Sequence, residues 1–152
     1  EFLSAKRQLE TLWRNNVLDI QHVGSTAISS ICAKPILDIA VRLKSIEAMD
    51  LKAMEQAGYE YCGARHGKDS YHLFVLRDEN DFSLRHIHCY APDEKEFFEQ
   101  VGFRDYLNTH PEEAKQYENL KKALAAQYAE ERFSYTAGKD SFIKNIISRL
   151  QI

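Results

Sequence analysis

Three short segments of this chain combine residue types that can bind an anion or a metal ion, and the first contains Gly24, Ser25 and Thr26. A glycine lets the backbone approach a ligand closely, and hydroxyl groups beside the unpaired N–H groups of a helix start can bind a phosphate. An ordinary strand-to-helix turn with a serine N-cap would explain the same residues. The segment therefore predicts a phosphate-binding turn, with the simple turn as the alternative.

The second segment places Asp38 in the middle of an apolar strand, residues 35–43. Strand alternation puts Leu37 and Ile39 on one face and Asp38 on the other. Aspartate is disfavoured inside strands, and a carboxylate in a cleft needs a metal, a cation or a hydrogen-bond partner. We expect Asp38 to be a metal ligand or a general base. Lys34, just before the strand, either meets an anionic ligand or is an ordinary surface lysine.

The third segment contains His86 and His88, which lie two residues apart on a predicted strand and so share one face. Two imidazoles in this arrangement can ligate a metal, contact a phosphate or exchange protons near neutral pH. Two half-exposed histidines on a sheet face are the alternative. We expect His86 or His88 to complete a site with Asp38, and Arg85 to neutralise a bound phosphate.

A fourth polar cluster, around Gly138 and Lys139, precedes the last predicted helix. Gly138 permits a tight turn from which Lys139 can reach a phosphate; a loop with a lysine at the helix start is the alternative. The charge run at residues 130–132 is interpreted as a solvated helix end.

The elements that would position these residues follow from the apolar pattern. Strands are predicted over residues 18–23, 35–43, 71–76 and 83–90, with another short strand within 59–69. A helix is expected from Ser45 to residue 57, and the chain is predicted to be helical from residue 93. Thr109 and Glu112 read as a capping box around Pro111. We therefore expect an α+β domain over residues 1–152, with a mixed sheet of four to five strands and a helical C-terminal third.

Composition narrows the class of protein. The chain has 152 residues, 44% of them hydrophobic, and a net charge of −3. This balance favours one globular domain and argues against a duplex nucleic-acid binder, which usually carries a strong basic excess. No apolar run of about 18 residues and no secretory signal are visible, so we expect a cytoplasmic protein without a membrane span. Three cysteines without CxxC spacing are interpreted as small buried residues: Cys32, Cys62 and Cys89.

Taken in order, several short motifs resemble the GrpB family. They cover residues 22–27, 34–39, 84–88, 103–107 and 110–114, followed by Tyr117, Leu120, Lys121, Tyr135, Lys139, Phe142 and Ile143. The resemblance extends over nearly the whole chain from Trp13 onward.

That resemblance implies the nucleotidyltransferase superfamily, whose members transfer a nucleoside monophosphate from an NTP to a hydroxyl or phosphate acceptor. Its pattern is a strand ending in Gly-Ser, then a strand with two carboxylates one residue apart that help to hold two divalent ions. Gly24, Ser25 and Asp38 match this pattern, whereas Ala40 stands where the second carboxylate belongs. Some relatives are fused to dephospho-CoA kinase, which implies a link to a coenzyme A pathway enzyme.

The leading hypothesis is a protein that binds a nucleotide or another phosphorylated small molecule, with nucleotidyl or phosphoryl transfer assisted by Mg²⁺ or Mn²⁺. In this hypothesis Asp38 and Ser25 are catalytic, and Asp38, His86 and His88 hold the metal. Phosphate would be bound by Gly24, Ser25, Thr26, Lys34, Arg85 and Lys139. One alternative is a non-catalytic ligand-binding or accessory domain linked to coenzyme A metabolism. Another is a metal-dependent hydrolase, which requires Asp38, His86 and His88 to converge.

Overall fold

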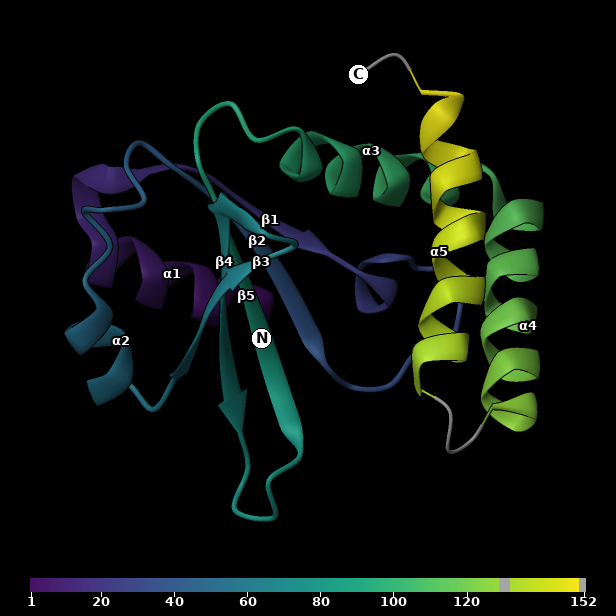
Figure 1. Ribbon diagram of the computed structural model, residues 1–152, viewed down its shortest axis with the longest axis horizontal. Helices are drawn as coiled ribbons and strands as arrows, with labels where there is room; N and C mark the ends of the chain where they lie inside the picture. Colours follow the sequence, from purple (N-terminus) through teal and green to yellow (C-terminus); the bar gives the residue numbers. More distant parts are fainter. Residues whose placement is uncertain (129–131, 151–152) are drawn as a thin grey trace.

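The computed structural model describes residues 1–128 and 132–150, and Figure 1 shows a five-stranded sheet with helices on both faces. The strands are β1 (Val17–Val23), β2 (Leu37–Leu43), β3 (Glu60–Arg65), β4 (Lys68–Arg77) and β5 (Ser83–Tyr90), in the spatial order β1-β2-β5-β4-β3. Strands β2 and β5 pair in parallel, and the other neighbours are antiparallel. The predicted mixed sheet and α+β class are confirmed.

One face of the sheet is covered by α1 (Phe2–Trp13) and α2 (Leu51–Gln56). Leu37, Ile39 and Val41 of β2 point to this face and join Leu9 and Trp13 of α1 in the largest apolar cluster. This is the face that strand alternation predicted for the apolar residues of β2. Asp38 is thereby directed to the opposite face.

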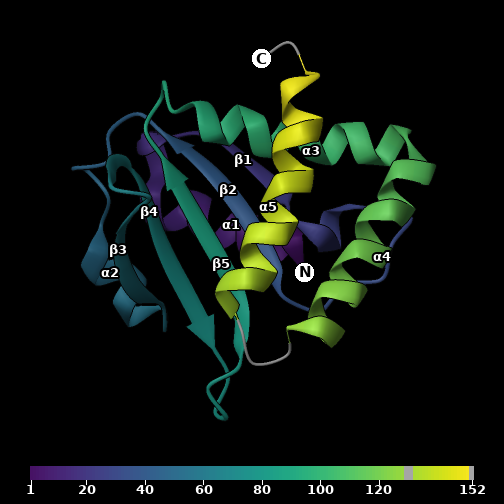
Figure 2. The same ribbon diagram turned by 45° about the vertical axis from the view of Figure 1, so that its right-hand side comes forward.

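The opposite face is covered by α3 (Lys95–Thr109), and α4 (Pro111–Gln127) and α5 (Arg132–Ser148) stand side by side at one end of the sheet (Figures 1 and 2). Phe97 of α3 packs on Ala40 and Tyr90 of the sheet. Phe103 and Tyr117 join α3 to α4. None of the helices in the described part of the chain is long and apolar enough to cross a membrane.

Several local predictions about helix ends are wrong. The helix expected from Ser45 begins only at Leu51, because Asp50 caps it by accepting a hydrogen bond from the Ala53 N–H at 2.9 Å. Thr109 is the last residue of α3 and forms no capping box. Its hydroxyl donates to the carbonyl oxygens of Asp105 and Tyr106.

Other differences concern the C-terminal region and the cysteines. Gly138 lies inside α5 against Leu124 of α4, so Gly138 and Lys139 belong to a helix rather than to a turn. Pro111 does begin α4, as predicted. Cys32 is exposed and only Cys89 is fully buried. The charged residues at 130–131 and the side chain of residue 132 lie outside the described part of the chain.

Candidate functional site: an acid–histidine cluster beside half-buried lysines

Asp38, His86 and His88 converge on the α3 face of the sheet. Asp38 and His86 are direct neighbours in the parallel β2–β5 register, and His88 pairs with Ala40. The Asp38 Oδ1 atom lies 3.3 Å from His86 Nδ1 and 2.9 Å from His88 Nε2. Because Ala40 is small, the His88 imidazole has room to reach Asp38. One ligand atom from each of the three residues lies within 4.8 Å of the other two.

Asp38 is ionised in this environment. Burial raises the pKa of its carboxyl group, but hydrogen bonds from His86 and His88 outweigh burial and hold the pKa well below its usual range. One carboxylate oxygen and two imidazole nitrogens fit a single divalent transition ion. They do not fit a pair of magnesium ions, which prefer oxygen ligands.

The turn after β1 is built around this carboxylate. Gly24 has φ +74°, and a Cβ atom there would lie 2.5 Å from Asp38 Oδ2, so only glycine fits without displacing Asp38. Arg104 of α3 holds the end of β1 by donating to the His22 carbonyl oxygen at 2.8 Å. Ser25 starts a single 3₁₀ turn (Ser25–Ala27) at the place where the sequence predicted a helix start.

A lysine of α4 contacts the same turn, and a lysine of α5 lies in the wall of the pocket beside it. The Lys121 ammonium group donates to Ser25 Oγ and lies 4.8 Å from the centre of the Tyr117 ring. Burial, followed by the charges of Lys139 and Lys34, lowers the pKa of Lys121. Within the described residues, neither Lys121 nor Lys139 forms an ion pair. An anion placed here would therefore be favoured by more than one positive charge.

A pocket of about 930 Å³ adjoins the turn after β1 and part of the acid–histidine cluster. Its wall includes Gly24, Ser25, Asp38, His88 and Lys139. Apolar side chains of α3, α4 and α5 form another part of the wall: Phe103, Tyr117, Ile143 and Ile147. The volume is that of a pocket for a small organic molecule, well beyond that of a single phosphate ion.

Two of the residues predicted for phosphate binding are directed elsewhere. Arg85 points to the α1 face, where it donates to the Tyr59 hydroxyl at 3.2 Å and pairs with Glu1 at 3.5 Å. Its predicted place beside a phosphate is wrong, because odd positions of β5 face away from His86. The Thr26 hydroxyl contacts His22 Nε2 at 2.9 Å. Thr26 therefore links the turn to β1 through its contact with His22.

Lys34 is exposed on the loop before β2 and influences the site through its charge. Lys139 lines the pocket from within α5, whereas the sequence predicted that it would reach a phosphate from a turn.

Two residues at the site, Lys121 and Tyr71, were not predicted from the sequence to have a role there. Lys121 belongs to the Tyr117–Lys121 part of the motif series, which was its only signal. Tyr71 begins a predicted apolar strand, and its hydroxyl lies 2.7 Å from His88 Nδ1. This contact depends on the register in which β4 pairs with β5, which the sequence does not reveal.

Comparisons with known proteins agree with the resemblance noted in the sequence. A family model described as GrpB protein matches residues 1–149. The glutamate-rich protein GrpB of Alkalihalophilus pseudofirmus is 37% identical over 98% of this chain and 88% of its own length. A crystal structure of conserved protein GrpB from Enterococcus faecalis superposes with a TM-score of 0.85 at 33% identity, covering 97% of this chain and 88% of that one.

The relatives differ in length. The UPF0157 protein YqkA of Bacillus subtilis is 34% identical over 94% of this chain, but the match covers only 41% of its own length. The corresponding share is 55% for a UPF0157 protein of Pseudomonas aeruginosa that is 33% identical.

Proposed function

This chain belongs to the GrpB family, and from that premise we propose that its pocket binds a nucleotide or a similar phosphorylated small molecule beside one divalent metal ion. The observation that carries the proposal is the position of Ser25. Its hydroxyl accepts from Lys121, and it lines the same pocket as Asp38 and His88. An anion site and a metal site therefore share one wall.

The phosphate would lie between Ser25, Lys121 and Lys139. Ser25 offers a hydroxyl, the two lysines offer positive charge, and the turn at Gly24 lets the backbone come close. Lys34 adds positive charge from the exposed loop before β2. The apolar wall around Phe103 and Ile143 would contact the uncharged part of the ligand, such as a nucleobase.

Asp38, His86 and His88 would hold the metal, and the donor set favours Mn²⁺ or Zn²⁺ over Mg²⁺. When bound, a divalent ion at this place polarises a phosphoryl oxygen as a Lewis acid. The chain's own residues orient the phosphate against that ion and neutralise its charge. This supports phosphoryl or nucleotidyl transfer as the reaction and a nucleotidyltransferase-like arrangement as its framework.

A metal-dependent phosphohydrolase is the second candidate. The convergence of Asp38, His86 and His88 meets the geometric condition that this candidate needs. The absence of a second carboxylate at Ala40 also removes the usual second ion of the transferases. Transfer and hydrolysis differ in the acceptor, which is a hydroxyl or phosphate group of a second molecule in one case and water in the other.

Thermal unfolding in the presence of nucleoside triphosphates with Mg²⁺, Mn²⁺ or Zn²⁺ tests the proposal. A ligand that binds only the folded state stabilises it by about 2.7 kcal/mol at a hundredfold excess over Kd. We expect a shift with a nucleotide and metal together, and its loss in Asp38→Asn. Asp19→Asn, on β1 beside Gln21, is the matched control.

Analysis of the products then separates the candidates. Pyrophosphate and a nucleotidylated acceptor indicate transfer, and phosphate release without an acceptor indicates hydrolysis. Binding without turnover indicates an accessory ligand-binding domain. No shift with any nucleotide or metal would refute the proposal.

A further inference from the structure

We propose that Tyr71 is a positioning residue that fixes the His88 imidazole with Nε2 directed at the metal. This inference rests on the proposed metal site and deepens it. The Tyr71 hydroxyl lies 2.7 Å from His88 Nδ1, while Nε2 of the same ring lies 2.9 Å from Asp38 Oδ1. Both ring nitrogens are thus in use, and the ring cannot turn without losing both contacts.

Tyr71 is itself firmly held. Only 6% of its surface is exposed, and its ring stacks on Tyr90 with 4.6 Å between the ring centres. The His66 ring packs edge-on against the Tyr71 ring, with 5.2 Å between the ring centres. A hydroxyl on a ring held in this way is a fixed hydrogen-bond partner for His88.

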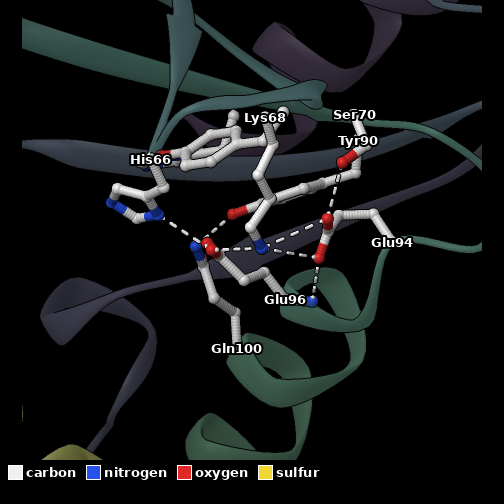
Figure 3. A network of polar contacts seen from close by, with 9 residues as sticks. His66, Lys68, Ser70, Tyr90, Glu94, Glu96 and Gln100 are labelled. Atoms are coloured by element: carbon white, nitrogen blue, oxygen red, sulfur yellow. Dashed lines mark hydrogen bonds and ion pairs between the residues drawn. The ribbon is translucent and has the colours of Figure 1, made fainter.

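The surrounding polar network holds these neighbours in place (Figure 3). Lys68 donates to Glu96 at 2.8 Å and to Glu94 at 3.2 Å, which ties the β3–β4 turn to the start of α3. His66 contacts the same Glu96 oxygen at 2.8 Å. The Gln100 amide of α3 donates to the Tyr90 hydroxyl. The network therefore holds His66 and Tyr90, the two rings that pack against Tyr71.

A phenolic hydroxyl suits both forms of the histidine ring. When Nε2 ligates a metal, Nδ1 carries the hydrogen and donates to the Tyr71 oxygen. Without metal, the Tyr71 O–H can donate to Nδ1 while the Nε2–H donates to Asp38. Such partners of metal-bound histidines typically change metal affinity about 10- to 100-fold when they are removed.

The chain provides a matched control on the same sheet. The Tyr61 hydroxyl lies 2.7 Å from His72 Nδ1, and the two rings stack. His72 Nε2 faces the Asp69 carbonyl oxygen at 2.9 Å, and this pair does not belong to the acid–histidine cluster. Tyr61→Phe therefore removes the same kind of hydrogen bond without touching the proposed metal site.

The experiment is a Zn²⁺ titration of the full chain in competition with a coloured chelator. We expect Tyr71→Phe to weaken Zn²⁺ binding about 10- to 100-fold and Tyr61→Phe to leave it unchanged. Circular dichroism and urea unfolding of each variant check that the chain is folded. Wild-type affinity retained in folded Tyr71→Phe would overturn the inference while leaving the metal site intact.

Imidazole ¹⁵N NMR gives a readout that does not depend on the variant. In the Zn²⁺-loaded wild-type chain, we expect His88 to carry its hydrogen on Nδ1 and the metal on Nε2. Zinc on Nδ1 would overturn the role of Tyr71 even if the variant failed to fold. Absence of Zn²⁺ binding by the wild-type chain would instead overturn the metal site and the inference together.

Discussion

Gly24 and Asp38 are in such close contact that a methyl group on Gly24 would overlap the Asp38 carboxylate. The added Cβ would lie 2.5 Å from Oδ2 and 2.8 Å from the Asp38 Cβ. Gly24 directly follows β1, and Val23, the last residue of that strand, is opposite Asp38 on β2. The glycine turn and the carboxylate therefore form one unit, and neither can shift without the other.

Gly24→Ala should destabilise the chain and disturb the site at once. A non-glycine residue in such a backbone conformation costs about 1–3 kcal/mol, and the overlap with Asp38 adds to this. We expect a lower midpoint of urea unfolding together with weaker Mn²⁺ or Zn²⁺ binding.

Gly63→Ala separates the two causes of that loss. Gly63 also has a positive φ, +78°, but a Cβ there would meet no atom within 4 Å. The Gly63→Ala variant should therefore have a lower free energy of unfolding, because of backbone strain alone, and should keep its affinity for the metal. If both variants lost the same stability and both still bound the metal, the contact between Gly24 and Asp38 would not be needed for the site.

Lys121→Gln should weaken binding of a phosphorylated ligand. A hydrogen bond to a charged group contributes about 1.5–3 kcal/mol, which corresponds to about a 10- to 100-fold change in Kd. Calorimetric titration with ATP and Mn²⁺ measures the effect. Lys122→Gln is the control, because Lys122 is exposed and lies 4.0 Å from Glu118. Equal losses in the two variants would indicate a diffuse charge effect instead of a site at Ser25.

Glu118 should make the free energy of unfolding depend on pH in the acid range. Its buried carboxylate pairs with Lys115 at 2.7 Å and accepts a hydrogen bond from the Cys32 N–H. These contacts lower its pKa from 4.5 to about 2. A lowered folded-state pKa means that the stabilisation is complete above pH 4.5 and is lost as pH falls through about 2.

Comparison of wild type with Glu118→Gln across this range tests that assignment. We expect the variant to be less stable near neutral pH, and the difference in urea unfolding to shrink between about pH 4.5 and 2. A difference that does not change with pH would mean that the charge of Glu118 is not responsible.

Strand alternation predicted the sheet side of the site. It directed Asp38 away from Leu37 and Ile39, and it placed His86 and His88 together. The same rule excludes Arg85 from that face, because Arg85 lies one position before His86 on the strand. The prediction that placed Arg85 with the histidines disregarded that alternation.

The helical side of the site could not be predicted in the same way. Lys121 reaches Ser25 across 96 positions of sequence, and this depends on how α4 packs against the turn. Gly138 resembled a turn residue, yet it lies in α5, where an added Cβ atom would lie 2.8 Å from the Leu124 side chain of α4. Both relationships arise from helix packing, which local residue patterns do not encode.

Crystals grown with Mn²⁺ or Zn²⁺ and a nucleotide test the central claim most directly, through an anomalous difference map. We predict one peak about 2.0–2.2 Å from an oxygen of Asp38 and a nitrogen each of His86 and His88. A phosphate should lie beside Ser25 and Lys121 in the same map. A peak at another place, such as His66 and Glu96, or no peak at Asp38 in metal-saturated crystals, would contradict the account.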